Sequence, residues 1–194
     1  MAKKGLLTKA DYLDIEQYRA VLKKLHDDKD YIDELYFVVA FSTALRISDL
    51  LKLKWNNILD RDNLTVTEQK TGKNRMVRFN ANVQLKIKEL YNLLHQPDKR
   101  YYLFKNSSYS NIEAQTINKR LKVIKDRYSL RIGNFSSHTF RKTFGRYVYE
   151  TSGKNENALL LLCSIFHHSN PAITIRYIGL RDDEICSVFD SIEF

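Results

Sequence analysis

The sequence has few of the residues that interrupt helices or cross-link chains. Its 194 residues include six glycines, two prolines and two cysteines. Sparse glycine and proline leave long uninterrupted stretches, which favours a helical fold over a loop-rich one. Cys163 and Cys186 have no CxxC spacing and no companion set of His and Cys ligands, so neither a disulfide framework nor a zinc site is indicated. This cysteine usage is typical of a reducing compartment.

Long apolar runs are also missing. No stretch approaches the roughly 20 apolar residues that a membrane helix needs, and the longest run lies around residues 158–163. The first residues, MAKKGLLTKAD, lack the apolar core of a signal peptide. We therefore expect a cytoplasmic protein with no membrane partner.

Basic residues are in excess, with 32 Lys and Arg against 23 Asp and Glu, for a formal charge of +9. This excess favours a polyanionic partner, because Lys and Arg that neutralise phosphates release counterions. Charge alone does not separate a DNA-binding protein from other basic proteins. With 43% hydrophobic residues the chain can bury a core, and we expect one domain over residues 1–194.

Apolar residues at helical spacing predict a mainly helical protein. Thr8 and Asp11 resemble a capping box, which predicts a first helix that starts there and runs to Leu25. Residues 64–67 and 76–79 alternate around a polar turn with Gly72, which predicts an antiparallel hairpin, and residues 57–59 are a candidate third strand. The expected fold class is mainly α with a small antiparallel β-sheet (α+β). The other expected helices cover about residues 30–44, 47–53, 81–94, 114–128, 137–151, 156–166, 172–177 and 183–191.

Five short motifs carry polar residues suited to catalysis. Each alone has an ordinary explanation, because surface arginines, capping histidines and spare tyrosines are common. Together, and in this order, they resemble the catalytic domain of the tyrosine recombinase (phage integrase) family, over nearly the whole chain from about Leu7. The motifs are Arg46-Ile47-Ser48-Asp49-Leu50, Glu68-Gln69-Lys70-Thr71-Gly72-Lys73, His138-Thr139-Phe140-Arg141, His168-Ser169 and Thr174-Ile175-Arg176-Tyr177.

The resemblance implies a site-specific recombinase or integrase that cleaves and rejoins DNA through a 3′-phosphotyrosine intermediate. Its nucleophile would be Tyr177, and the other catalytic residues would be Arg46, Lys70, His138, Arg141 and His168, supported by Asp49. The chemistry agrees, because two guanidiniums can stabilise the charge that develops on the non-bridging phosphate oxygens.

Proton transfer needs a base for the phenol and an acid for the leaving 5′ oxygen, and His138 and Lys70 suit these roles. His168 would bind a phosphate oxygen or help hold Tyr177, and Asp49 would orient the site from behind Arg46. Neither a metal nor another cofactor is implied, because the phosphotyrosine conserves the energy of the broken bond.

Two departures from the family pattern leave alternatives open. His167 stands where a glycine usually precedes the final histidine, so this helix end must form without glycine and His167 competes with His168. Lys73 competes in the same way with Lys70. The other departures are Ala44 for a glycine, Asp49 for the usual glutamate and Lys142 for a second histidine.

The partner implied by the resemblance is double-stranded DNA. The candidate contacts are Lys73 at the hairpin and Lys119, Arg120, Lys122 and Lys125 on the helix expected at 114–128, for which a solvated helix face is the alternative. We expect a monomer or weak oligomer when free and a tetramer on DNA, where the protein would be nucleoid-associated. A C-terminal helix in 181–194 would pack on a neighbouring protomer or, alternatively, on its own domain.

Members of the family usually carry a further N-terminal helical domain that closes around DNA. We expect only a tail of residues 1–6 before the first helix and no such core-binding domain, and the sequence fits either a catalytic fragment or a minimal recombinase. Two other functions are a type IB topoisomerase, which shares this catalytic logic, and a DNA-binding regulator without catalysis. The nine-residue spacing from His168 to Tyr177 favours the recombinase. Integration, transposition of a mobile genetic element and resolution stay open.

Overall fold

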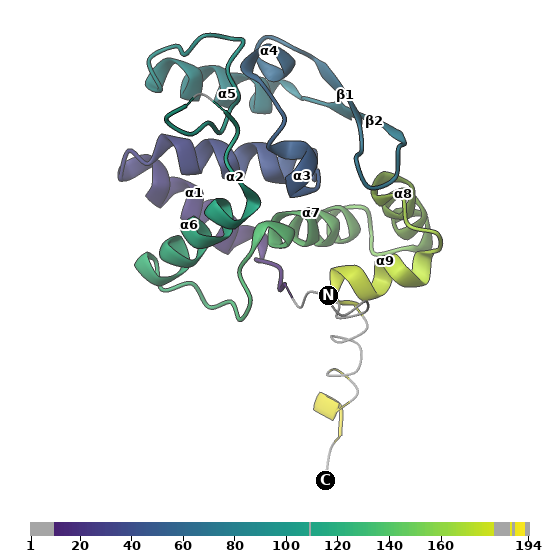
Figure 1. Ribbon diagram of the computed structural model, residues 1–194. Helices are drawn as coiled ribbons and strands as arrows, with labels where there is room; N and C mark the ends of the chain where they lie inside the picture. The colour runs from purple at the N-terminus through teal and green to yellow at the C-terminus, as the bar shows by residue number, and fades with distance from the viewer. Residues whose placement is uncertain (1–9, 109, 181–186, 188, 193–194) are drawn as a thin grey trace, which may run out of the picture.

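A computed structural model describes residues 10–108, 110–180, 187 and 189–192. Within these residues the chain is mostly helical and carries one two-stranded antiparallel sheet, which confirms the predicted class (Figure 1). The elements are α1 (Ile15–Asp27), α2 (Tyr31–Thr43), α3 (Ile47–Leu50), α4 (Trp55–Ile58), β1 (Asn63–Thr67), β2 (Asn74–Arg78), α5 (Ala81–Leu93), α6 (Ala114–Arg127), α7 (Ser137–Thr151), α8 (Glu156–Phe166) and α9 (Pro171–Ile178).

The main core forms around α2, which packs against α1, α5 and α7. Apart from the polar residues of its first turn, α2 is apolar on nearly all sides, as expected of a buried central helix. Its Phe37 meets Phe140 of α7 edge to face, with ring centroids 4.7 Å apart, and Tyr36 meets the same ring at 5.2 Å. These aromatic contacts fix the start of α7 against α2.

A second, smaller apolar cluster joins α8 and α9 to the end of α2. It contains Ala44, Leu162, Phe166, Ile178 and Leu180. The close approach of α9 to α7 depends on Gly145, because a Cβ at that position would lie 2.5 Å from Cγ2 of Ile178. The seam between the two clusters is where α2 ends, α7 begins and α8 ends.

The hairpin pairs Leu64 with Val77 and places both on the buried face. Residues 57–59 do not add a strand, so that prediction is wrong. They lie in and just after α4, where Trp55, Ile58 and Leu59 repeat at helical spacing and are all buried.

The first helix begins later than predicted. α1 starts at Ile15, where the Asp14 side chain accepts a hydrogen bond from the backbone N–H of Gln17 at 2.8 Å. Asp11 instead binds Asn134 in the α6–α7 connection, through its own backbone N–H and through its carboxylate. The proposed partner Thr8 lies outside the described residues.

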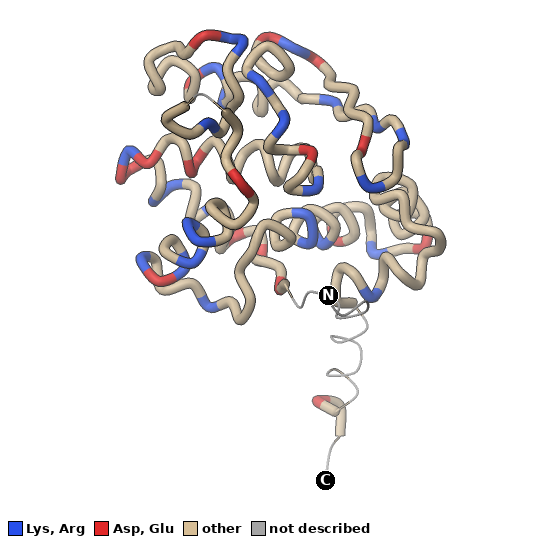
Figure 2. Tube along the Cα trace, in the orientation of Figure 1, with Lys and Arg blue, Asp and Glu red and all other residues tan. Residues whose placement is uncertain are grey.

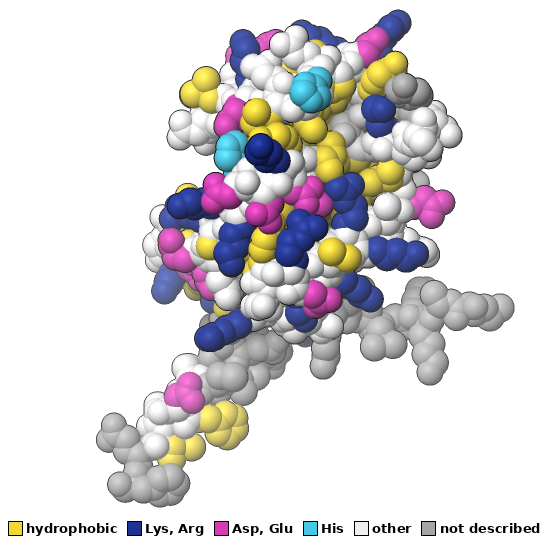
Figure 3. All heavy atoms as spheres, turned by 90° about the vertical axis from the view of Figure 1, so that its left-hand side faces the viewer, with side chains coloured by type: hydrophobic (Ala, Val, Ile, Leu, Met, Phe, Trp, Pro, Cys, Tyr) yellow, Lys and Arg dark blue, Asp and Glu magenta, His cyan; other side chains and the backbone are white. Residues whose placement is uncertain are grey.

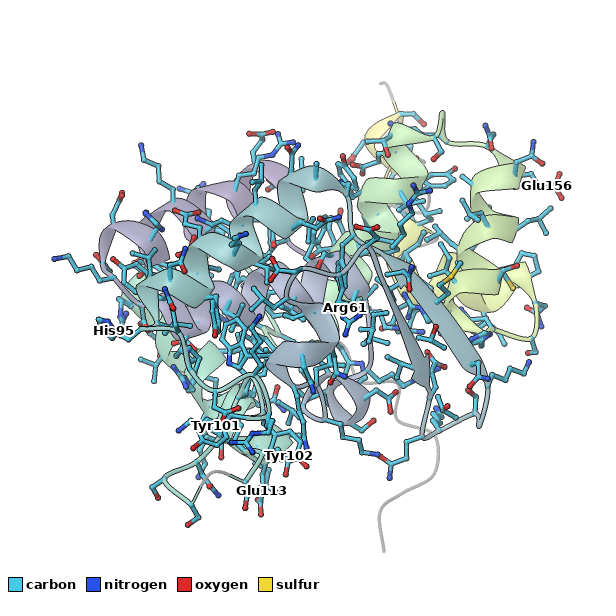
Figure 4. The ribbon with its side chains drawn as sticks, turned by 90° about the horizontal axis from the view of Figure 1, so that it is seen from above. Arg61, His95, Tyr101, Tyr102, Glu113 and Glu156 are labelled. Atoms are coloured by element: carbon cyan, nitrogen blue, oxygen red, sulfur yellow. The ribbon has the colours of Figure 1, made fainter. Side chains whose placement is uncertain are left out.

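The connection between α5 and α6 runs back to the start of α4. Lys54 and Tyr102 form an isolated bridge, and the Lys54 ammonium lies 5.1 Å from the centre of the Tyr102 ring. In Figure 4, Tyr101, Tyr102 and Glu113 lie at the opposite end of the molecule from Glu156 at the start of α8.

The terminal predictions fall largely outside the described residues. The tail 1–6 is not described, nor is most of the helix expected at 183–191. Within 181–194, Phe189 and Ile192 are described and are 68% and 54% exposed. Among the described residues no single helix is long and apolar enough to cross a membrane; α8 and α9 reach that length and composition only as a pair bent by 91°.

Candidate active site

Arg46 is held at the junction of α2 and α3. α2 ends at Ala44, which adopts the left-handed conformation with φ of 45°, and Arg46 is the N-cap of α3. Its Nη1 donates to Glu68 Oε2 at 2.6 Å, and its Nη2 donates to the Phe166 carbonyl at 3.4 Å. The side chain is 16% exposed, so the guanidinium is held in place and still reaches solvent.

Arg141 lies on α7 one turn after His138 and is buried. Its Nη1 donates to the Ala44 carbonyl at 2.5 Å and its Nη2 to the Phe166 carbonyl at 3.1 Å. The guanidinium carbon lies 4.4 Å from the centre of the Phe166 ring, a cation–π contact. Burial lowers the pKa of Arg141 to about 10, and it stays charged at neutral pH.

Both arginines therefore bind the carboxyl ends of helices. Ala44 closes α2 and Phe166 is the last residue of α8, where carbonyl groups have no partner within the helix. These ends also carry the negative end of the helix dipole, which favours a cation. The two helix ends thus orient both guanidiniums through backbone carbonyls.

A third arginine, Arg75 of β2, shares this arrangement. Its Nη1 donates to the Ala44 carbonyl at 3.0 Å and its Nη2 to the Thr43 carbonyl at 2.5 Å. Nη1 also lies 3.7 Å from Glu68 Oε1. Burial lowers the pKa of Arg75, with the charge of Glu68 opposing that shift.

The turn of the hairpin is anchored on α3. Asp49 is buried, and its Oδ1 accepts a hydrogen bond from the Gln69 backbone N–H at 3.0 Å. The Lys70 side chain is exposed and makes no hydrogen bond or ion pair with a described residue. The backbone beside Lys70 is therefore held in place while its side chain is free to reorient.

His138 is half-buried at the start of α7. Burial lowers its pKa, and the charges of Arg141, Lys142, Arg46 and Lys70 act in the same direction. His138 is therefore neutral at pH 7 and able to accept a proton.

His168 and Tyr177 meet beside the Phe166 ring. The His168 ring centroid lies 5.3 Å from that of Tyr177, and His168 Nδ1 is 2.9 Å from Thr174 Oγ1. Burial, with the charges of Arg141, Arg46 and Lys70, lowers the pKa of His168 to about 4. Tyr177 Oη is buried and has no hydrogen-bond partner among the described residues. Burial raises the pKa of Tyr177, and the charges of Arg141 and Arg46, together with the close approach of the Arg141 guanidinium to the hydroxyl, oppose the rise.

His167 has a structural position, whereas His168 lies with Tyr177. His167 closes α8 in the left-handed conformation with φ of 53°, and its N–H binds the carbonyls of Cys163 and Ser164. Its Nε2 is buried and has no hydrogen-bond partner in the described part of the chain. The position filled by glycine in the family pattern is thus occupied at a cost, because a side chain in this conformation is strained.

We expect His167→Gly to stabilise the protein by about 1 kcal/mol, because it removes this strain together with an unpaired buried nitrogen. For a chain of this size that is a rise of about 2 to 4 °C in Tm, measurable by calorimetry. His167→Ala keeps the strain and is the matched control. DNA cleavage should be retained in both variants, and its loss would return the catalytic role to His167.

No group of three or more His, Cys, Asp and Glu side chains among the described residues is placed to hold a metal ion. Tyr177 lies beside the His168 ring and within reach of the charges of Arg141 and Arg46, and the charge of Lys70 acts on His168 and His138. Such a set can bind an anion and move protons around it.

The sequence matches the phage integrase family over residues 11–184. The chain belongs to the phage integrase family. Its enzyme class is accordingly that of the tyrosine site-specific recombinases. A relative in Bacillus subtilis (strain 168), described as "Probable integrase/recombinase YoeC", is 30% identical over 172 residues, which are 84% of this chain and 88% of the relative. Tyrosine recombinase XerC of Histophilus somni (strain 2336) is 26% identical over 92% of this chain, which spans 59% of XerC.

Solved structures of phage integrase relatives share the fold. The crystal structure of XerA recombinase matches 94% of this chain with a TM-score of 0.71 at 19% identity, and 66% of XerA is covered. The lambda integrase catalytic core matches 78% of this chain with a TM-score of 0.58 at 18% identity, and 90% of that core is covered. The matched relatives are recombinases and integrases, so the comparisons do not favour the topoisomerase alternative.

The structure brings the predicted set together at the seam described above. Arg46 and Arg141 share the Phe166 carbonyl, and His168 and Tyr177 lie against the Phe166 ring. The charge of Lys70 acts on both His138 and His168, and Lys73 is not among the charges that act on either, which favours Lys70. Figure 2 shows basic positions at the hairpin tip and in α7 on facing parts of the chain.

The DNA-contact candidates of α6 divide into two groups. Arg120 pairs with Asp33 at 2.8 Å, and the Lys125 ammonium donates to the Gly133 carbonyl at 2.7 Å. Lys119 and Lys122, three residues apart on one side of the helix, are exposed. Basic and acidic side chains alternate on the face seen in Figure 3, consistent with such local pairing.

Sequence reasoning missed Arg75 and Glu68. A signal for Arg75 was available, because it alternates with Val77 of β2 and with Phe79 just after the strand on the inward side, where an arginine is out of place. Glu68 had no comparable signal, because a glutamate beside a polar turn is ordinary. Its complete burial appears only in the structure.

Proposed function

We propose that this chain breaks and rejoins DNA through a covalent bond between Tyr177 and a backbone phosphate. The observation that carries the proposal is the buried Tyr177 hydroxyl, which makes no well-aligned hydrogen bond among the described residues and lies beside Arg141 and His168. An unpaired buried hydroxyl is costly for folding, so it indicates a group kept for a reaction.

In the proposed reaction, Tyr177 Oη attacks the phosphorus and the bond to the 5′ oxygen breaks. The products are a 3′-phosphotyrosine and a free 5′-hydroxyl, and attack by a 5′-hydroxyl reverses the reaction and releases the tyrosine. The guanidiniums of Arg46 and Arg141 bind the non-bridging oxygens, where negative charge develops in the transition state. Their backs are held by the Ala44 and Phe166 carbonyls, so little reorganisation is needed.

Two protons must move in opposite directions. His138, neutral because of burial and its cationic neighbours, takes the proton of the Tyr177 phenol. Lys70 gives a proton to the leaving 5′ oxygen. His168 is also neutral at pH 7. Its Nδ1 faces Thr174, and its Nε2 forms a hydrogen bond with the phosphate or with Tyr177. Asp49 supports these groups by anchoring the turn that carries Lys70.

The proposed partner is double-stranded DNA bound by several copies of the chain. Relatives with this fold have been solved on DNA: XerH bound to its difH substrate and a lambda integrase dimer bound to a core site. We propose a tetramer on DNA, in which the segment 181–194 packs on a neighbouring protomer. The high exposure of Phe189 and Ile192 supports a partner for that segment.

The test is covalent capture on a nicked suicide duplex, in which the short 5′-hydroxyl fragment diffuses away and religation stops. A protein–DNA band should survive a denaturing gel and disappear after protease treatment. If the protein binds a duplex but no bound duplex gives the covalent adduct, a regulator without catalysis is favoured.

Lys119 and Lys122 are the proposed phosphate contacts of α6. Replacing either by Ala should weaken binding similarly for all sequences and reduce the slope of log affinity against log salt by about 0.9, as expected for one lost phosphate contact. Titrations at several salt concentrations measure this slope. Arg120→Ala on the same helix is the matched control, because its guanidinium is paired with Asp33. Equal slopes for all three variants would place the duplex elsewhere.

A further inference from the structure

Glu68 is a buried carboxylate that joins two parts of the site. It is 0% exposed and lies two residues before Lys70. One oxygen, Oε2, accepts hydrogen bonds from Arg46 Nη1 at 2.6 Å and from Thr71 Oγ1 at 3.1 Å. The same oxygen therefore binds both Arg46, which is predicted to contact the phosphate, and Thr71, which follows Lys70.

The backbone around Glu68 is fixed at the same time. Its N–H donates to the Lys73 carbonyl at 2.9 Å, and its carbonyl accepts from the Gly72 N–H at 2.8 Å, which closes the turn around Lys70. Asp49 binds the next residue, Gln69. Arg46 and Asp49 both belong to the start of α3. This short helix therefore holds the Lys70 turn at two points, by the Arg46–Glu68 contact and by the Asp49 carboxylate.

The charge of Glu68 matters as well as its hydrogen bonds. Three guanidiniums, those of Arg46, Arg75 and Arg141, converge on Ala44, Phe166 and Glu68. Burial would raise the pKa of Glu68, but the Arg46 hydrogen bond and the charges of Arg46 and Arg141 lower it, so it is ionised. Its second oxygen has no hydrogen bond in the described structure and lies 3.7 Å from Arg75. A neutral amide cannot supply this counter-charge.

We propose that Glu68 is a positioning residue that sets Arg46 and the Lys70 turn relative to one another. The guanidinium that binds the phosphate and the ammonium that protonates the leaving oxygen are then placed as one unit. This inference rests on the proposed function, because it takes Arg46 and Lys70 in those two roles. Glu68 itself touches neither the phosphate nor the leaving oxygen.

The experiment compares single-turnover cleavage of ordinary DNA and of DNA with sulfur at the 5′ bridging position, which leaves without protonation. Glu68→Gln should cleave ordinary DNA at least about tenfold more slowly, a part of the 10² to 10⁴ that general acid catalysis supplies. On the sulfur-containing DNA, Glu68→Gln should regain only the part of the lost rate that comes from the misplaced Lys70. The ratio of sulfur to ordinary rates should thus exceed that of the unaltered protein and fall below that of Lys70→Ala.

Thr71→Val separates the contact of Glu68 with the Lys70 turn from its contact with Arg46. It removes the hydrogen bond to the turn but leaves Arg46 on Glu68, so its smaller loss should be fully restored by sulfur. If Glu68→Gln does not fold, Thr71→Val decides the question alone. A sulfur-to-ordinary ratio equal to that of the unaltered protein in these variants would overturn the proposal, because a loss of folded protein lowers both rates equally.

Glu34→Gln is the matched control for a buried glutamate. Glu34 is 1% exposed and binds Lys86 at 2.6 Å and His26 at 3.0 Å, on α2 near α1 and α5. Glu34→Gln should lower the stability of the protein and leave the ratio of sulfur to ordinary cleavage rates unchanged. Absence of sulfur rescue in Lys70→Ala would contradict the role of Lys70, whereas rescue there with an unchanged ratio in Glu68→Gln would contradict the inference alone.

Discussion

Tyr177→Phe is expected to abolish the covalent adduct while leaving the affinity for DNA unchanged. The substitution removes only the attacking oxygen, and the ring keeps its packing against Phe166 and His168, with centroids 5.5 and 5.3 Å away. No other nucleophile replaces the lost hydroxyl at this position. The expected loss is complete, and it is measured as covalent capture on the nicked suicide duplex.

Folding gives an independent check on the same variant. The Tyr177 hydroxyl is buried without a well-aligned hydrogen bond among the described residues, so its removal costs little and relieves a poorly satisfied polar group. Tyr177→Phe should therefore be as stable as the unaltered protein or more stable in a denaturant titration. Tyr149→Phe is a suitable control, because it removes a tyrosine hydroxyl from the same end of the molecule, one that donates to the Lys154 carbonyl. Normal adduct levels in Tyr177→Phe would falsify the assignment of the nucleophile.

Local sequence was enough to place most helices, because their ends carry their own signals. α8 begins after Asn155, whose side chain accepts from the Ala158 N–H, and α7 begins after the capping residue Ser136. The start of α1 needed tertiary information. Asp11 and Asp14 are both suitable caps, and the choice is made by Asn134, a residue 123 positions away that binds Asp11.

The side chains of the site could also be predicted from the sequence motifs, whereas the groups that hold them in place could not. Arginine, histidine, lysine and tyrosine can be read from motifs, because their side chains do the work. The groups that hold Arg141 are the Ala44 and Phe166 carbonyls, and a backbone carbonyl has no sequence signal. The departures at Ala44 and His167 therefore turn out to be linked: both residues end their helices in the left-handed conformation, and these two helix ends hold the arginines.

Lys70→Ala is expected to slow cleavage of ordinary DNA by about 10² to 10⁴, the usual contribution of a general acid. The structure supports Lys70 through its exposed, unpaired side chain on a fixed backbone and through its electrostatic effect on His138 and His168. Sulfur at the 5′ bridging position removes the need for the proton, so the variant should cleave that substrate nearly as fast as the unaltered protein. Rates of adduct formation on the two substrates measure the effect.

Two further variants decide whether this rescue is specific to the acid. Arg141→Ala should stay inactive on the sulfur substrate. In the proposed reaction its charge acts on the non-bridging oxygens, and its loss leaves the Ala44 and Phe166 carbonyls with fewer donors. Lys73→Ala should cleave ordinary DNA almost normally, since Lys73 contributes to the turn through its backbone carbonyl, and the charges that act on His138 and His168 include Lys70 but not Lys73. If sulfur restores Lys73→Ala and leaves Lys70→Ala inactive, the acid is Lys73, and the fixed turn serves to present the later lysine instead.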